Sequence, residues 1–304
     1  MFAKLICMFM LFLSITAQAK LESPLIPSRY LSINGLSIAA YESSGKKEPT
    51  VFLIHGNTSS ANSFARIMRS AFANKYRVVA IDMAGYGRSS NAPSYDVTTF
   101  TSVVSQAAQQ LQVHKGVIVG WSLGGDIALQ TAHLLPQAKG YFLFGTAPVG
   151  GGPATPSPFL TPVESYAGAA TQYGFVPVLL PMQVNDYVTA FFRPQWPLIP
   201  NFFYQDGYRT DGGTRLALVV AASGSDPNFK AEVPVAQNLQ VPIALVHAEQ
   251  DAFVRLEYLQ AIAPTIPQLW RGNIQVVPNV GHALQWEKPQ VFISLLKKFI
   301  SDLP

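Results

Sequence analysis

The 304-residue chain is apolar and weakly charged: 49% of its residues are hydrophobic, 12% are charged, and the formal net charge is +4. Such a composition supports a large buried core in one or two domains and excludes an intrinsically disordered chain. Lysine and arginine residues form no cluster, so we expect no nucleic-acid partner.

The first residues are typical of a secretory signal. Lys4 precedes the apolar run Leu5–Ile15, and Ala17–Ala19 has the small-x-small pattern of a cleavage site. A membrane anchor is the alternative, but this run is shorter than the ~20 residues that span a bilayer. The pattern therefore predicts a signal peptide at 1–19 and a periplasmic or secreted protein without a stable membrane anchor. The single cysteine, Cys7, lies within it, so the mature protein has no disulfide.

Short apolar strands and helices alternate in the first half of the mature chain. Asn34-Gly35 joins two alternating segments, Arg29–Ile33 and Leu36–Glu42, as in a β-hairpin. After it we expect strands at Thr50–Ile54, Arg77–Ile81, Gly116–Val119 and Tyr141–Phe144, and helices at Ser60–Ala73, Thr98–Leu111 and Gly124–Leu135. This alternation predicts an α/β fold with a mostly parallel sheet flanked by helices, and a site at the carboxyl ends of its strands.

The pattern changes between residues 150 and 225, where proline is frequent and large aromatic residues crowd together. Proline prevents long helices, and a disordered linker would not carry so many aromatic rings. We interpret 150–225 as a helical lid, because an ordinary long loop would leave the rings exposed. The α/β core is then 20–149 and 226–304, and its second part contains the predicted elements Val241–Val246, Arg255–Ala261, Ile274–Val277 and Pro289–Ser301.

Ser122 is the candidate nucleophile. It lies in Gly120-Trp-Ser-Leu-Gly124, between an apolar strand and a predicted helix, which is the context that G-x-S-x-G requires. Glycine at both ends lets the backbone turn sharply enough to present the serine hydroxyl at the top of a sheet. A chance Gly-Ser-Gly loop is the alternative.

A base and an acid must accompany a serine nucleophile. Among the five histidines, His282 follows a late predicted strand in a short turn, where its ring can reach Ser122. Asp251 follows the Val241–Val246 strand and is the expected acid, with Glu249 as a rival in the same loop. The resulting order along the chain is serine, acid, histidine, as in one hydrolase architecture.

The oxyanion of an acyl-transfer reaction needs aimed N–H donors. The backbone N–H of Leu123, next to the nucleophile, and that of Asn57, after the Thr50–Ile54 strand, are the expected donors. Asp82 and Asp126 are interpreted as structural. The histidines lack the close spacings of metal-binding motifs, so we expect no metal and no other cofactor.

With these residues, the chain resembles the α/β-hydrolase fold family over nearly its whole mature length. The matching motifs are His55-Gly56, Asp82-x-x-Gly85-x-Gly87-x-Ser89, Gly120-x-Ser122-x-Gly124, Asp251 and Gly281-His282. The resemblance implies a serine nucleophile. Relatives that dehalogenate substrates or open epoxides carry aspartate in its place, so Ser122 argues against both activities.

Segments 55–60, 119–125, 145–149, 251–254 and 279–282 also look like the metal-independent N-acyl-homoserine lactonases of this fold. That similarity implies hydrolysis of a lactone ring, with Tyr187 in the place of a lid tyrosine that helps to hold the substrate carbonyl. Trp121 either lines the acyl pocket or packs under the lid.

These inferences give one hypothesis: an exported serine hydrolase that cleaves a small-molecule ester or lactone through an acyl-enzyme, with an N-acyl-homoserine lactone as a candidate substrate. The same triad could serve a general carboxylesterase or lipase-like enzyme, an amidase or peptidase, or a perhydrolase. A ligand-binding protein with little turnover is the alternative outside the enzymes.

Overall fold

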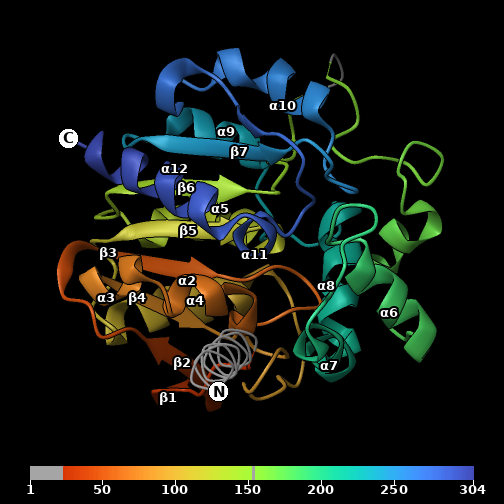
Figure 1. Cartoon of the computed structure of the whole chain (residues 1–304), viewed down its shortest axis with the longest axis horizontal. Helices are drawn as coiled ribbons and strands as arrows, with labels where there is room; N and C mark the ends of the chain where they lie inside the picture. Colours follow the sequence, from red (N-terminus) through yellow and green to blue (C-terminus); the bar gives the residue numbers. More distant parts are fainter. Residues whose placement is uncertain (1–22, 153–154) are drawn as a thin grey trace, which may run out of the picture.

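An eight-stranded sheet forms the centre of residues 23–152 and 155–304, the part of the chain that the computed structural model describes (Figure 1). The strand order is β1-β2-β4-β3-β5-β6-β7-β8. The strands are β1 (Arg29–Ile33), β2 (Leu36–Glu42), β3 (Lys47–Ile54), β4 (Tyr76–Ile81), β5 (Val117–Trp121), β6 (Gly140–Phe144), β7 (Ile243–Ala248) and β8 (Gln275–Val277).

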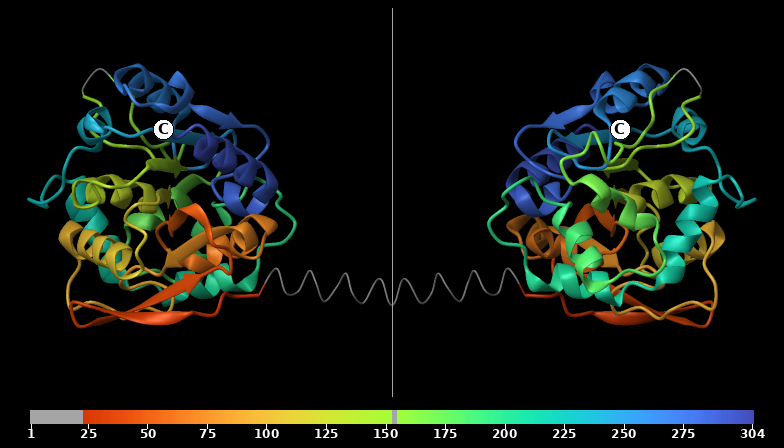
Figure 2. Two further views of the ribbon diagram at one scale, coloured as in Figure 1. Left: turned by 90° about the vertical axis from the view of Figure 1, so that its left-hand side faces the viewer. Right: turned by 90° about the vertical axis from the view of Figure 1, so that its right-hand side faces the viewer.

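The sheet is mostly parallel, as predicted. β1 and β2 form the expected antiparallel hairpin at one edge (Figure 2), and Asn34 and Gly35 both have the positive φ values that such a tight turn needs. β2 pairs antiparallel with β4, and the remaining neighbours pair parallel. The chain passes from β3 to β4 on one side and later returns to β5 on the other, so a binding crevice is expected outside the carboxyl ends of β3 and β5.

Helices cover both faces of the sheet. One face packs against α2 (Ala65–Met68), α3 (Ala71–Lys75), α11 (Leu284–Glu287) and α12 (Pro289–Ser301), and the opposite face packs against α4 (Val97–Gln110), α5 (Leu123–Thr131), α9 (Glu232–Asn238) and α10 (Leu256–Ile262). Successive side chains of a strand enter opposite cores: Val117 and Val119 of β5 join the first, and Ile118 joins the second. This two-sided burial explains why β5 is apolar throughout.

Several predicted boundaries differ from the structure. The predicted helix Ser60–Ala73 is divided into the 3₁₀ helix η1 (Ala61–Phe64), α2 and α3. Ser70 causes the break between α2 and α3, because its side chain accepts the backbone N–H of Ala73 and so starts a new helical segment.

Two further predicted elements are shifted or shortened. The predicted helix Gly124–Leu135 is α5, which ends at Thr131 and continues as the 3₁₀ helix η2 (Ala132–Leu134). The predicted strand Val241–Val246 begins at Ile243, after Pro242, which has no N–H for strand pairing. This strand extends to Ala248 because its end pairs with β8.

Short helices lie between β6 and α9, at the carboxyl ends of the strands (Figures 1 and 2). They are η3 (Gly168–Phe175), α6 (Pro181–Thr189), α7 (Asn201–Arg209) and α8 (Gly212–Ala222), and we call them the lid. The domain boundaries at 150 and 225 stay a prediction. Two more 3₁₀ helices, η4 (Ala263–Thr265) and η5 (Trp270–Gly272), follow α10. Within the described ranges, no helix has the length and hydrophobicity needed to cross a bilayer.

Candidate active site

Ser122 occupies a strained turn between β5 and α5. Its backbone has φ 52° and ψ −128°, a conformation that non-glycine residues rarely adopt and that costs on the order of 1–3 kcal/mol. The Ser122 N–H donates to the carbonyl oxygen of Phe144 at 3.0 Å, and Thr146 Oγ1 donates to the Ser122 carbonyl oxygen at 2.9 Å. These contacts hold the strained residue against β6.

Glycines allow this turn to pack closely. A Cβ atom on Gly124 would lie 2.2 Å from the carbonyl oxygen of Ile54, and one on Gly120 would lie 2.4 Å from the Gly125 Cα atom. Both distances are far below van der Waals contact. The sequence motif therefore reflects a steric requirement: helix α5 must start directly against β3, which places Ser122 over the crevice.

His282 and Asp251 form a buried pair. His282 Nδ1 lies 2.8 Å from Asp251 Oδ2, while Asp251 Oδ1 accepts the backbone N–H groups of Phe253 and Val254 at 2.8 and 3.1 Å. Burial alone would raise the pKa of Asp251, but His282 and these hydrogen bonds hold it below its usual value. The Asp251 carboxylate can thus fix the ring orientation of His282 and leave Nε2 free for another group.

Glu249, the rival acid, points elsewhere. It is exposed and its Oε2 accepts the backbone N–H of Asn279 at 2.7 Å, so it holds the turn before His282. His55 is also engaged by backbone: its ring nitrogens lie 2.8 Å from the Gly56 oxygen and 3.0 Å from the Met83 nitrogen. Among the described residues, no group of three or more His, Cys, Asp or Glu side chains could hold a metal ion.

Ser122 and His282 line the same cavity. No hydrogen bond joins their side chains within the described chain, and such bonds are often long before substrate binds. His282 is held at its backbone and at its ring: the Trp121 indole N–H donates to the His282 carbonyl oxygen at 2.9 Å, and the Phe253 ring packs against the imidazole at 4.7 Å between centroids. These contacts fix the position of His282 in the wall of the cavity that Ser122 also lines.

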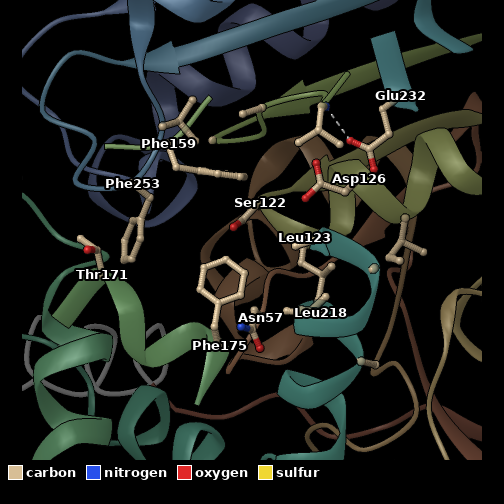
Figure 3. Close-up of a pocket in the computed structure, with 18 of the residues that line it drawn as sticks. Asn57, Ser122, Leu123, Asp126, Phe159, Thr171, Phe175, Leu218, Glu232 and Phe253 are labelled. Carbon is tan, nitrogen blue, oxygen red and sulfur yellow. Dashed lines mark hydrogen bonds between the residues drawn. The ribbon is translucent and has the colours of Figure 1, made fainter. Parts of the chain in front are cut away.

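The two expected oxyanion donors border this cavity. Leu123 and Asn57 both line it, and within the described residues neither backbone N–H has an acceptor. Figure 3 shows Asn57, Leu123 and Ser122 close together at one side. The Asn57 side chain donates to the Gly174 carbonyl oxygen of the lid at 2.9 Å, which fixes the loop that carries its N–H. The arrangement provides free donors beside the candidate nucleophile.

The cavity has a volume of about 160 Å³ and is mainly apolar. Its walls combine core and lid residues, among them Phe159, Phe175, Leu218 and Phe253, which surround Ser122 in Figure 3. An apolar pocket with few polar groups suits the acyl part of a substrate.

Tyr187 and Trp121 take different positions. Tyr187 of α6 lines the cavity, as expected of a substrate contact, and burial raises the pKa of its phenol. Trp121 is buried and is not part of the cavity lining; its ring packs edge-on against Phe191 at 5.4 Å. Of the two roles considered for Trp121, the geometry favours packing beneath the lid.

An acidic pair in the cavity wall has no signal in the sequence. Asp126 of α5, which had been interpreted as structural, lines the cavity together with Glu232, the first residue of α9. The two carboxyl groups interact with each other. Burial, then the Glu232 charge, raises the pKa of Asp126, and burial raises the pKa of Glu232 to about 7. A local motif could not reveal this pair, because it depends on the packing of two distant helices.

Known proteins share this architecture. A crystal structure of the N-acyl homoserine lactonase AidH complexed with N-butanoyl homoserine is similar with a TM-score of 0.80 and 28% identity, covering 91% of this chain and 97% of that chain. The 2-hydroxy-6-oxo-6-(2'-aminophenyl)hexa-2,4-dienoic acid hydrolase of Metapseudomonas resinovorans is 27% identical, with 90% of each chain covered. Epoxide hydrolase 3 of Xenopus tropicalis is 25% identical, over 88% of this chain and 76% of that protein.

The family comparison agrees with the fold. The model of the alpha/beta hydrolase family matches residues 51–295, a range that extends from β3 into α12 and includes Ser122, Asp251 and His282. The chain therefore belongs to the alpha/beta hydrolase family.

Proposed function

We propose that this hydrolase cleaves a carboxylic ester or lactone with Ser122 as nucleophile. One observation carries the proposal: His282, which is hydrogen-bonded to the buried Asp251, lines the same cavity as Ser122 in its strained turn. A serine hydroxyl attacks a carbonyl only when a base accepts its proton, and this cavity supplies one.

In the proposed mechanism, His282 Nε2 takes the Ser122 proton as the oxygen attacks the substrate carbonyl carbon. The N–H groups of Leu123 and Asn57 stabilise the oxyanion, and Asp251 stabilises the imidazolium. His282 then protonates the departing alkoxide, which leaves an acyl-enzyme. Water, deprotonated by His282, attacks the acyl carbonyl and releases the carboxylic acid while Ser122 regains its proton.

An N-acyl-homoserine lactone is the proposed substrate. The apolar cavity suits an acyl chain, and Tyr187, the proposed contact of the substrate carbonyl, lines the same cavity. The similarity to the lactonase AidH extends over most of both chains. Acyl-homoserine lactones and p-nitrophenyl esters, assayed with a chelator present, test the substrate; turnover of the esters but not of the lactones would restrict the enzyme to esters.

The Ser122→Ala variant tests the nucleophile. We expect ester and lactone turnover to fall by at least ~10³-fold while the circular dichroism spectrum is unchanged, because the variant lacks the attacking oxygen. An active-site-directed fluorophosphonate should label the wild-type protein and not the variant. Turnover that survives the substitution would remove Ser122 from this role.

We also propose export to the periplasm or the cell exterior. The predicted signal at 1–19 lies outside the described residues, so the support comes from its sequence pattern alone. Fractionation of cells that express the full chain, followed by N-terminal sequencing, tests this proposal. Cleavage after Ala19 is the expected result, and an intact N-terminus on protein retained in the cytoplasm would contradict it.

A further inference from the structure

The acidic pair in the cavity wall does not take part in the proposed mechanism, yet it lies beside the nucleophile. Asp126 follows Ser122 by one helical turn on α5, and Figure 3 shows Asp126 and Glu232 pointing toward each other next to Ser122. Ser122 and Asp126 both line the same cavity. A substrate bound to Ser122 therefore comes within reach of Asp126.

The two carboxyl groups have unequal partners. Glu232 accepts the backbone N–H of Val149 at 3.0 Å and the side-chain amide of Gln130 at 3.1 Å. Among the described residues, no N–H or O–H group of the protein is aimed at Asp126 apart from its contact with Glu232. The negative charge is thus best stabilised on Glu232, and the shared proton belongs to Asp126.

This proton distribution leaves a free acceptor in the cavity. Asp126 Oδ1 is buried, whereas the residue as a whole is only half-buried and borders the cavity. When one oxygen of Asp126 donates its proton to Glu232, the other is a neutral carbonyl oxygen on a residue that borders the cavity, and it can accept a hydrogen bond from a ligand there. A neutral acceptor also avoids the repulsion that a carboxylate would exert on an oxyanion forming at Ser122.

We propose that Asp126 selects substrates that carry an N–H donor on the carbon next to the scissile carbonyl, as an α-acylamino lactone or ester does. This inference rests on the proposed function and names a specificity-determining residue for it. The amide nitrogen of such a substrate lies about 2.5 Å from the carbonyl carbon, so attack by Ser122 on the carbonyl keeps the N–H inside the cavity that Asp126 also lines.

Two matched substrate pairs test the inference. The first is N-hexanoyl homoserine lactone and its analogue in which CH₂ replaces the amide N–H; the second is the p-nitrophenyl ester of N-hexanoylglycine and its CH₂ analogue. We expect wild-type kcat/KM to favour the N–H member of each pair by ~10-fold or more, because the analogue leaves a buried acceptor unpaired. The ester pair decides the outcome if the lactones are poor substrates.

Variants of Asp126 separate recognition from packing. Asp126→Leu, without an acceptor, should bring the preference close to parity. Asp126→Asn should keep it within ~3-fold of wild type, because an amide donates to Glu232 and still presents a carbonyl oxygen. Ile127→Val alters the neighbouring cavity-lining residue of α5, and it should affect both members of a pair equally.

The outcomes distinguish this inference from the proposed function. The role of Asp126 is overturned if the wild type turns over the N–H substrate and its CH₂ analogue equally, or if Asp126→Leu lowers kcat/KM equally for the two. Either result leaves the proposed serine hydrolase activity intact. If Asp126→Leu does not fold, the inference is tested by the preference of the wild type for the N–H substrate and by the retention of this preference in Asp126→Asn. Absence of all ester and lactone turnover, or turnover that persists in Ser122→Ala, overturns the proposed function and this inference with it.

Discussion

Asp251 and Glu249 lie two positions apart in one loop, and their surroundings assign them different tasks. Asp251 is buried against His282, whereas Glu249 is exposed and accepts the backbone N–H of Asn279. The two side chains leave the loop in different directions: Asp251 points toward His282, and Glu249 points toward the turn after β8. Only Asp251 is placed to orient an imidazole.

Asp251→Asn should lower kcat by ~10³–10⁴-fold with a smaller change in KM, because an amide no longer stabilises the imidazolium and favours the wrong tautomer. The matched variant Glu249→Gln should keep kcat within ~2-fold, since it alters an exposed side chain. Steady-state kinetics with a p-nitrophenyl ester measures both. A similar loss in the two variants, or none in Asp251→Asn, would refute the assignment of the acid.

At this scale, some site residues could be found from sequence and others could not. Ser122, Asp251 and His282 each follow a strand in a turn with a local pattern, and the sheet brings them to one edge; their catalytic roles stay a prediction. Glu232 has no local signal, and its contact with Asp126 exists only because α9 packs against α5. Site residues that are brought together by the packing of two helices can be identified only from the three-dimensional structure.

Among the elements, strands were predicted more accurately than helices. A buried strand such as Val117–Trp121 is a short apolar run bounded by turn residues, so its position is visible in the sequence. The predicted helix Ser60–Ala73 was wrong as a single element because Ser70 caps an internal turn, an effect that hydrophobic periodicity does not show.

Helix α7 is tied to the core by a buried carboxyl group. Asp206 accepts a hydrogen bond from Ser60 Oγ at 2.5 Å and from Asn62 Nδ2 at 3.1 Å. Burial raises the pKa of Asp206 to about 7. The Asp82 charge also raises this pKa, whereas the Ser60 hydrogen bond and the Arg88 charge lower it. The lid attachment is therefore sensitive to pH.

The free energy of unfolding should therefore depend on pH. Between an unfolded pKa near 3.8 and a folded pKa of about 7, the folded state binds more protons at Asp206 than the unfolded state. The contribution of Asp206 to the free energy of unfolding is therefore complete at pH values below its unfolded pKa. It falls by up to about 1.4 kcal/mol per pH unit as the pH rises, and it levels off above the folded pKa.

Asp206→Asn should reduce this dependence, because an amide does not titrate. We expect the urea midpoint of the wild type to fall more between pH 5 and pH 8 than that of the variant. Asp302→Asn, at an exposed ion pair with Arg271, should keep the wild-type dependence. Equal slopes for wild type and Asp206→Asn would show that Asp206 is already ionised in the folded state.

For the molecule as a whole, the sequence indicated the class of fold but not its assembly. Alternating strands and helices predict a parallel sheet, whereas the strand order depends on which helices pack on which face. The lid was recognised by its prolines and aromatic residues, yet its packing joins residues far apart in the chain. Phe202 and Phe203 of α7 pack edge-on against Trp286 of α11, each at 5.3 Å between ring centroids.

Lid and core should unfold together because one hydrophobic cluster contains both. Val188 of α6 and Val119 of β5 are completely buried members of that cluster. Val188→Cys and Val119→Cys, each in a chain with Cys7 replaced by serine, place a single thiol in either part. Labelling of these thiols across a urea series should give midpoints that agree within about 0.3 M, since shared burial makes opening cooperative. A lid thiol that becomes reactive at clearly lower urea, while activity is lost and the core thiol stays protected, would show that the lid opens as a separate unit.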